Sequence, residues 1–160
     1  VKEALLRRNA CMIIALHPFV RNLYNKPLEA PFLMAAHLGI CIEYLMAASS
    51  CLISDYSSVI IDWLLLSRPM SLYCPDLADY KSQRGFPYFD YDQTFGTFAA
   101  ADAGAVAAAI DRALGESPNG QEKMARLRQM FHAYPAGGAS RRIFDRVLDE
   151  VRRKQREPGV

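Results

Sequence analysis

The chain has 160 residues, of which 51% are apolar and 22% are charged, and its formal net charge is +2. This length suits one ordinary domain with a full core, and the composition excludes a disordered or fibrous chain. The small net charge argues against a nucleic-acid-binding protein, which needs a strongly basic surface. The charge is nevertheless uneven, since residues 121–160 carry ten Lys or Arg against five Asp or Glu.

The four cysteines are scattered, mostly within apolar runs, and form no Cys-x-x-Cys pair (Cys11, Cys41, Cys51 and Cys74). We therefore expect buried, reduced thiols of a cytoplasmic protein, without disulfides or zinc. The three histidines lack metal-ligand spacing, so we also expect no metal site. The most apolar window, residues 31–49, contains His37 and Glu43, which excludes a membrane-spanning helix there.

In the first half, short apolar runs alternate with segments of helical period, which is typical of a parallel sheet covered by helices on both faces. Helices are predicted at residues 2–9, 43–50 and 58–66, and strands at 12–16, 39–42, 51–54 and 70–74. Residues 19–37 stay ambiguous, with a helical turn at 33–37, because Pro27 and Pro31 interrupt any long element. The sequence predicts a doubly wound, Rossmann-like α/β fold.

The second half is predicted to be mostly helical. Residues 75–101, with aromatic side chains among Pro, Gly and Asp, indicate an ordered loop. Asp102 is predicted to cap a helix at 103–114, and two further helices follow at 121–134 and 139–154. The last of these carries an apolar stripe at helical spacing (Ile143, Phe144, Val147, Leu148 and Val151). We expect one domain over residues 1–154 and a frayed tail at 155–160.

The stretch most informative about function runs from Ser54 to Ser58, between a predicted buried strand and a predicted helix. It offers the carboxylate of Asp55, the hydroxyls of Ser57 and Ser58, and the amides of a first helical turn. Because unpaired amides and the positive end of the helix dipole point the same way, such a loop can hold a phosphate. The simpler alternative is that Ser57 or Ser58 only caps the helix.

One further pair of candidate residues lies at a strand end, where ligands of doubly wound sheets bind. His17 and Pro18 follow the first strand, and His17 is either a general base or phosphate ligand, or a structural histidine. Asp62 interrupts an apolar helix face and is either solvent-exposed or paired. Arg84 lies among aromatic residues and is either a phosphate ligand or part of a loop that these aromatic side chains hold against the sheet. Dinucleotide-binding, Walker and serine-hydrolase motifs do not occur in the sequence.

Five segments, taken in order, resemble one family: Leu16-His17-Pro18, Ile53 to Asp62, Arg68-Pro69, Tyr73 to Tyr80, and Arg84 to Asp90. They are similar to the carboxyl-terminal half of the CDP-glycerol glycerophosphotransferases, the primases and polymerases of teichoic acid synthesis. The resemblance covers most of the chain, from about residue 5 to residue 150. Residues 94–97 depart from the family, which usually has a Pro-Gly pair there.

The resemblance implies a GT-B architecture, with this chain as the donor-binding domain and an amino-terminal domain missing. It implies a CDP-glycerol or related CDP-alditol donor, a lipid-linked polyol phosphate acceptor, and no firmly implied cofactor. It places His17 at the reaction centre and the donor's phosphates at the loop of Asp55, Ser57 and Ser58, and it matches Arg84 to an arginine of the family. We expect Pro18, Ser54 and Asp62 to bind the donor as well. We expect a cytoplasmic enzyme, peripheral at the inner face of the membrane, and no turnover by this chain alone.

Two alternatives remain open. A GT-B glycosyltransferase that uses a UDP- or GDP-sugar would have the same fold and a different donor. A non-catalytic module would instead dock on a membrane or a polyanion through the basic residues of segment 121–156. The second alternative leaves the polar loops at the strand ends unexplained.

Overall fold

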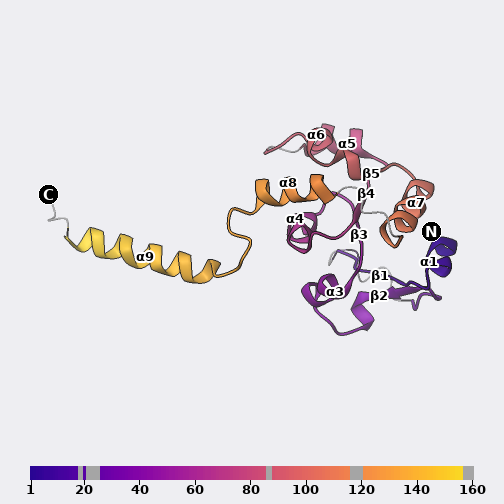
Figure 1. Ribbon diagram of the computed structural model, residues 1–160, viewed down its shortest axis with the longest axis horizontal. Helices are drawn as coiled ribbons and strands as arrows, with labels where there is room; N and C mark the ends of the chain where they lie inside the picture. Colours follow the sequence, from indigo (N-terminus) through magenta and orange to yellow (C-terminus); the bar gives the residue numbers. More distant parts are fainter. Residues whose placement is uncertain (18–19, 21–25, 86–87, 116–120, 157–160) are drawn as a thin grey trace.

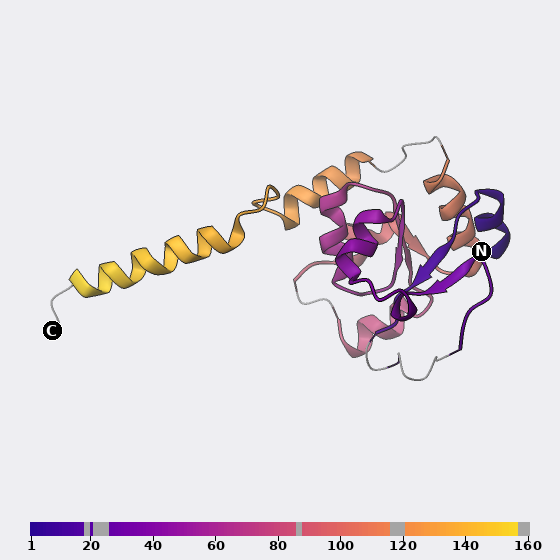
Figure 2. The same ribbon diagram turned by 90° about the horizontal axis from the view of Figure 1, so that it is seen from below.

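The structure is a computed structural model that describes residues 1–17, 20, 26–85, 88–115 and 121–156. Parallel strands lie in the middle of the body, with helices on both sides (Figures 1 and 2). β1 (Met12–Ile14) pairs with β2 (Phe32–Met34) in one parallel ladder. β3 (Leu52–Ser54), β4 (Met70–Tyr73) and β5 (Ala99–Ala100) form a second parallel ladder, in that order. The predicted parallel α/β fold is confirmed.

Helices connect and flank these strands. The first half contains α1 (Lys2–Arg7), the 3-10 turn η1 (Ala35–His37), α3 (Ile42–Ala48), α4 (Val59–Trp63) and the 3-10 turn η2 (Leu64–Leu66). The second half contains α5 (Leu77–Gln83), α6 (Tyr91–Phe95), the 3-10 turn η3 (Gly96–Phe98), α7 (Ala103–Ala113), α8 (Gln121–Phe131) and α9 (Ala139–Arg156). All six predicted helices are present, with small shifts at their ends.

The larger apolar core packs against one face of β4. Met70, Leu72 and the following Cys74 alternate along the strand and belong to the same buried cluster as side chains of α4, η2, α6 and α8. Trp63 of α4 is fully buried in it, and its indole N–H donates to the carbonyl oxygens of Arg68 (2.9 Å) and Pro69 (3.1 Å). These bonds fix α4, and with it the loop that precedes α4, to the start of β4.

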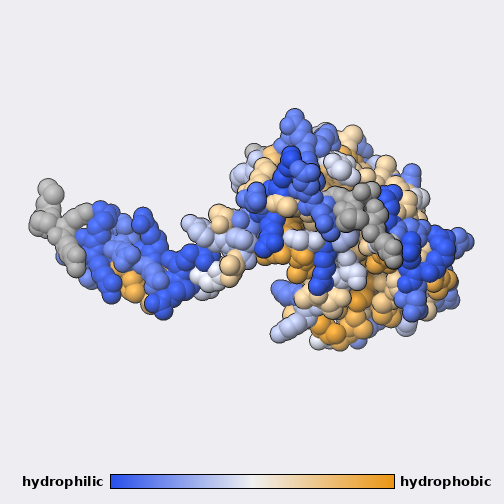
Figure 3. Space-filling model, viewed as in Figure 1, coloured by the Kyte–Doolittle hydropathy of each residue, from blue (hydrophilic) through white to orange (hydrophobic). Residues whose placement is uncertain are grey.

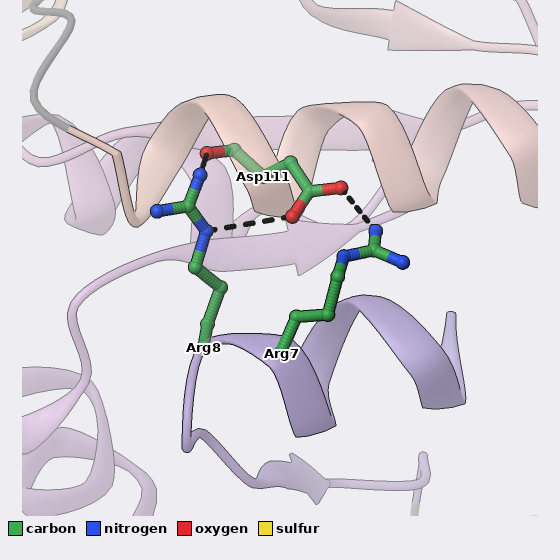
Figure 4. A network of polar contacts seen from close by, with 3 residues as sticks. All are labelled: Arg7, Arg8 and Asp111. Atoms are coloured by element: carbon green, nitrogen blue, oxygen red, sulfur yellow. Dashed lines mark hydrogen bonds and ion pairs between the residues drawn. The ribbon is translucent and has the colours of Figure 1, made fainter.

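A second, smaller cluster joins α1 to α7. Its buried members are Ala4, Leu5, Ala100, Val106 and Ile110. Polar contacts close the same joint: Arg7 donates to Asp111 Oδ2 (2.6 Å) and Arg8 to Asp111 Oδ1 (3.4 Å) (Figure 4). The hydrogen bond from Arg7 lowers the pKa of Asp111, so the carboxylate is charged at neutral pH.

Asp102 was expected to cap the helix at 103–114, and this prediction is confirmed. Its side chain accepts a hydrogen bond from the Ala105 amide at 2.8 Å, at the start of α7. α7 contacts both β4 and β5, on the opposite side of the ladder from α4 and α8 (Figure 1). The capped helix therefore supplies one of the two covering layers of the sheet.

Two predictions of local structure are wrong. Residues 39–42 do not form a strand, because Gly39 adopts a left-handed turn (φ 63°) and α3 begins at Ile42. Residues 75–101 are not simply a loop, since they contain α5, α6, η3 and β5. These elements have two to seven residues, too few to show a period in the sequence. The Asp90 side chain caps α6 by accepting from the Gln93 amide at 3.0 Å.

α9 extends away from the rest of the molecule in both ribbon views (Figures 1 and 2). It continues through Gln155 and Arg156, beyond the predicted end at residue 154. Residues 157–160 of the predicted tail lie outside the described residues, as does Pro18. In the part of the chain that is described, every helix is too short or too polar to cross a lipid bilayer.

Of the four cysteines, only Cys74 is fully buried and Cys51 is half-buried, whereas Cys11 and Cys41 are exposed. All four thiols are free in the structure, and the expectation of burial was wrong for Cys11 and Cys41. Cys11 directly precedes β1, and Cys41 directly precedes α3. Their apolar neighbours in the sequence do not cover them. Burial raises the pKa of Cys51 to about 11, so this thiol is neutral at physiological pH.

Candidate functional site

The loop from Ser54 to Ser58, which we call the serine loop, connects the carboxyl end of β3 to α4. The Asp55 carboxylate accepts a hydrogen bond from the Ser57 amide (3.0 Å), and the Ser57 hydroxyl accepts one from the Val59 amide (3.4 Å). Each side chain thus satisfies an amide two residues ahead, which favours a turn. Asp55, Ser57 and Ser58 are exposed. The serine loop therefore presents two hydroxyls from a backbone with a defined shape.

The helix-capping alternative holds only in part. Ser58 occupies the N-cap position of α4, but its side chain makes no capping hydrogen bond. The Ser57 hydroxyl accepts a long hydrogen bond from the amide of Val59, the first residue of α4. Ser57 lies one position before the N-cap residue. Capping alone therefore does not account for both hydroxyls.

Tyr56, in the middle of the serine loop, anchors it to the end of the neighbouring strand. Its hydroxyl donates to Asp76 Oδ1 at 2.8 Å, and Asp76 lies just beyond β4. Its ring stacks on Tyr80 of α5, with centroids 3.9 Å apart and an interplanar angle of 22°. Burial, and then the hydrogen bond to Asp76, raise the pKa of Tyr56. The phenol therefore stays a neutral donor at physiological pH.

A buried polar pair continues this anchor into the core. Cys74 Sγ lies 3.1 Å from the hydroxyl of Tyr91, and both residues are buried. The Tyr91 ring meets Tyr56 edge-on at 5.9 Å. Burial is the main cause that raises the pKa values of Cys74 and Tyr91, so both groups are neutral at physiological pH. Cys74 is therefore a packing and hydrogen-bonding residue, since a nucleophilic cysteine needs a lowered pKa.

Arg84 belongs to the same structural unit as the serine loop. It follows the last residue of α5, and its amide donates to the Tyr80 carbonyl at 2.9 Å. Tyr80 in turn stacks on Tyr56, so one residue links the arginine segment to the serine loop. α5 is about 10 Å long, from seven residues at 1.5 Å each. The Arg84 side chain is exposed at the far end of that helix from Asp76.

His17 and Asp62 lie elsewhere. His17 is exposed, three residues beyond β1, and its backbone carbonyl accepts from the Val20 amide at 2.9 Å. It therefore follows the first ladder, whereas the serine loop follows the second. Met12 of β1 and Ile53 of β3 pack against the same apolar cluster, so the two ladders share a core. Asp62 is exposed on α4, which confirms the solvent-facing alternative.

The anchor formed by Tyr56, Asp76 and Tyr91 was not predicted from sequence. Tyr56 lies between two polar residues of a loop, a pattern that does not reveal what the ring contacts. Asp76 is twenty residues away, on another strand end, so the hydrogen bond depends on the tertiary fold. A half-buried tyrosine hydroxyl usually has a hydrogen-bond partner, but the half-burial of Tyr56 is visible only in the structure.

Among the described residues, no three His, Cys, Asp or Glu side chains come together in a way that could hold a metal ion. The Arg84 guanidinium is a side chain that can supply positive charge to a phosphate, and the serine hydroxyls can supply neutral donors.

Comparison with solved structures identifies the fold. The chain superimposes on the wall teichoic acid polymerase TagF with a TM-score of 0.70 and 23% identity, over 98% of this chain and 40% of that one. A TagF variant soaked with CDPG gives a TM-score of 0.74 and 22% identity, over 98% and 41%. The parallel α/β domain is thus a Rossmann-like half of a GT-B architecture.

Sequence comparison places the chain in a family. Residues 2–149 match the family of CDP-glycerol:poly(glycerophosphate) glycerophosphotransferases, and the chain belongs to it. The teichoic acid ribitol-phosphate primase of Bacillus spizizenii is 41% identical over 88 residues, which are 55% of this chain and 22% of that protein. The glycerol-phosphate primase of the same species is 25% identical over 91% of this chain and 36% of that protein. The chain thus spans well under half of these relatives.

Proposed function

We propose that this chain is the donor-binding domain of an enzyme that transfers glycerol phosphate, or a related alditol phosphate, from a CDP-activated donor to a lipid-linked acceptor. The product is teichoic acid or a similar polymer of the cell envelope. The observation that carries the proposal is the serine loop, held in place by Tyr56 in a member of the glycerophosphotransferase family. Family membership and the names of the relatives support the reaction class.

The residues fit this chemistry. The hydroxyls of Ser57 and Ser58 donate to the diphosphate of the donor, and Arg84 supplies a positive charge that binds phosphate oxygens in a fork. Asp55 is itself an anion, and its bond to the Ser57 amide suits it to shaping the loop. Ser54 ends the strand below the loop, and Asp62 lies on the exposed side of α4, where it is suited to the nucleoside more than to phosphate.

The reaction needs one group that takes up the proton of the attacking hydroxyl. The acceptor hydroxyl attacks the phosphorus next to the alditol, a new phosphorus–oxygen bond forms, and the bond to CMP breaks. His17 takes the hydroxyl proton or stabilises the developing charge, and Pro18 belongs to the same proposed donor site. No cofactor is assigned; the CDP-alditol is the only small molecule in the proposal. An amino-terminal domain brings the acceptor, so we expect donor binding without turnover by this chain alone.

A lipid-linked acceptor also sets the location of the reaction. We infer that the enzyme works in the cytoplasm and that it touches the inner face of the membrane. The basic bias of residues 121–160 supports such contact, since basic segments are attracted to anionic lipid.

Calorimetric titration of the 160-residue chain with CDP, UDP and GDP tests the proposal. We expect CDP to bind tightest. Ser57→Ala should weaken CDP binding by about 10- to 100-fold, because hydrogen bonds to a charged phosphate contribute about 1.5–3 kcal/mol each. Ser140→Ala is the matched control, since Ser140 is an exposed serine on α9 and should leave binding unchanged.

The other outcomes are equally informative. Tighter binding of UDP or GDP would replace the proposed donor with a nucleotide sugar, the glycosyltransferase alternative. No heat with any nucleotide, from protein that unfolds cooperatively, would contradict a donor site on this chain.

A further inference from the structure

The core next to the serine loop contains polar side chains that come from different elements and contact one another. Tyr91 of α6 and Cys74, the residue that follows β4, are buried, and Tyr56 of the serine loop is half-buried. Much of the surface over α5 and α6 is hydrophilic (Figure 3), so these groups lie under a polar exterior. Because buried polar groups are costly unless they are hydrogen-bonded, their arrangement needs a reason.

Cys74 contacts both tyrosines. Its Sγ lies 3.1 Å from the hydroxyl of Tyr91, and the centroids of the Tyr56 and Tyr91 rings are 5.9 Å apart. Burial is the main cause of the raised pKa values of Cys74 and Tyr56, and a hydrogen bond between these two side chains acts on both values. The Tyr56 hydroxyl donates to Asp76 at 2.8 Å. Four side chains therefore form a continuous chain of hydrogen bonds.

The donors of this chain point in one direction. A carboxylate only accepts, so the single proton of the Tyr56 hydroxyl is directed to Asp76. The Tyr56 oxygen therefore accepts from the Cys74 thiol, and the Cys74 sulfur accepts from the Tyr91 hydroxyl. Each group donates once along the chain, and hydrogen bonds in such a series strengthen one another inside a core.

Tyr91 starts the chain from a fixed position. Its helix, α6, is held by polar contacts to two other helices: Asp92 is paired with Lys81 of α5, and the Gln93 carbonyl accepts from Lys123 of α8 at 2.9 Å. Tyr91 itself is almost completely buried. The Tyr91 hydroxyl is therefore a rigid reference point for the groups that follow it.

The rest of the chain is fixed by the sheet. The Cys74 amide donates to the Ala100 carbonyl of β5 at 3.0 Å, and Asp76 is the N-cap residue of α5. The hydrogen bonds made by the side chains of Asp55 and Ser57 are local, since each joins residues two positions apart. Tyr56 is thus the side chain that connects this local geometry to the core.

We propose that Tyr91 and Cys74 are positioning residues for the donor site. They act through Tyr56 and hold the hydroxyls of the serine loop in the geometry that binds phosphate. The inference rests on the proposed function and deepens it, because it adds two buried residues that affect the donor only through another side chain.

Packing alone does not require these polar groups. Phe95 and Phe131 belong to the same apolar cluster, and their rings stack with centroids 5.8 Å apart without any polar atom. An aromatic ring without a hydroxyl would fill the place of Tyr91 equally well and would need no buried partner. The Tyr91 hydroxyl instead lies against the thiol that leads to the serine loop.

The first test is hydrogen exchange of the Ser57 and Val59 amides, followed by NMR on the 160-residue chain without ligand. Side chains of the loop accept from these amides, so their exchange reports on its shape. Tyr91→Phe removes the first hydrogen bond of the chain, and Cys74→Ala removes the first two. Exchange should accelerate about twofold and about fivefold, because sulfur is a weak acceptor and an average hydrogen bond corresponds to about a fivefold change in an equilibrium.

Calorimetric titration of the same variants with CDP is the second test, and CDP affinity should fall by similar factors. Cys74→Ser supplies a hydroxyl that both donates and accepts, so it should recover most of the affinity that Cys74→Ala loses. A packing role predicts no such recovery, since serine and alanine leave similar space unfilled. Leu127→Val is the control, because Leu127 is buried in the same cluster and is not part of the chain, and it should change neither exchange nor affinity.

Unchanged exchange of the two amides in Cys74→Ala overturns the inference, and so does a Cys74→Ser variant that behaves like Cys74→Ala. Faster exchange with full CDP affinity would also overturn the positioning role. Faster exchange in a chain that binds no nucleotide would support the chain of hydrogen bonds and contradict the donor site alone. CDP binding that none of these variants alters would contradict this inference and leave the proposed function standing.

Discussion

The serine loop and α9 differ in how their side chains are supported. In the serine loop, the polar groups are supported by the contacts of one aromatic residue. Tyr56 stacks on Tyr80, contacts the edge of Tyr91 and donates a hydrogen bond to Asp76. In α9, apolar groups stand on a single helix and remain about half exposed. The first arrangement holds the hydroxyls of the serine loop in one geometry, which would favour a small anionic ligand because preorganised donors lose little entropy on binding. The second leaves the apolar side chains of α9 exposed among the described residues.

The largest expected effect comes from removing the same amount of apolar side chain from the buried core and from α9. Leu72 of β4 is fully buried, and Leu72→Ala should lower the free energy of unfolding by about 2–5 kcal/mol. Ile143 of α9 is 65% exposed, and Ile143→Ala should change it by less than about 0.5 kcal/mol. Urea unfolding measures both. Similar losses in the two variants would mean that α9 packs on the body.

The next prediction tests whether the contacts of Tyr56 position the serine loop. Tyr56→Phe keeps the ring stack and removes the hydrogen bond to Asp76, which should cost about 1 kcal/mol of stability. If the bond positions the serine loop, CDP binding should weaken by about fivefold. Calorimetry with Tyr44→Phe as the control checks this, because Tyr44 is an exposed tyrosine on α3. Full CDP affinity in Tyr56→Phe would show that the loop holds its shape without this bond.

The smallest effect concerns the contact between Arg7 of α1 and Asp111 of α7. Its loss should affect neither the serine loop nor α9. The Arg7 hydrogen bond lowers the pKa of Asp111 in the folded chain, below the usual value of about 3.9. Its stabilisation is therefore present above about pH 4 and is lost as the pH falls through the folded-state value. Unfolding of the unchanged chain and of Asp111→Asn across acidic pH should show a difference that shrinks with acidity. A constant difference would contradict this cause.

The parts of the fold that were predicted are those with strong local signals. Apolar runs indicated three of the strands, and helical period indicated six helices. β2 and β5 have three and two residues, and α5 and α6 have seven and five, so neither run length nor period revealed them. Residues 39–42 looked like a strand because the left-handed turn at Gly39 is not visible in an apolar run.

The residues of the candidate site were proposed from the sequence, whereas the contacts that support the serine loop were not. The position of the serine loop between a strand and a helix followed from the change from apolar to polar residues at Ser54. The bond between Tyr56 and Asp76 depends on the alignment of β3 with β4, which local sequence does not determine. The apolar stripe of α9 was predicted too, but its exposure depends on where the helix lies relative to the body.

Hydrogen exchange with and without saturating CDP is the most direct test of the donor site. We predict slower exchange in peptides that cover the serine loop and α5, the two segments joined by Tyr56 and Tyr80, and unchanged exchange along α9. Exchange that slows only in other segments, with the serine loop unaffected while CDP is bound, would contradict the assignment of the donor site to the loop between Ser54 and Ser58.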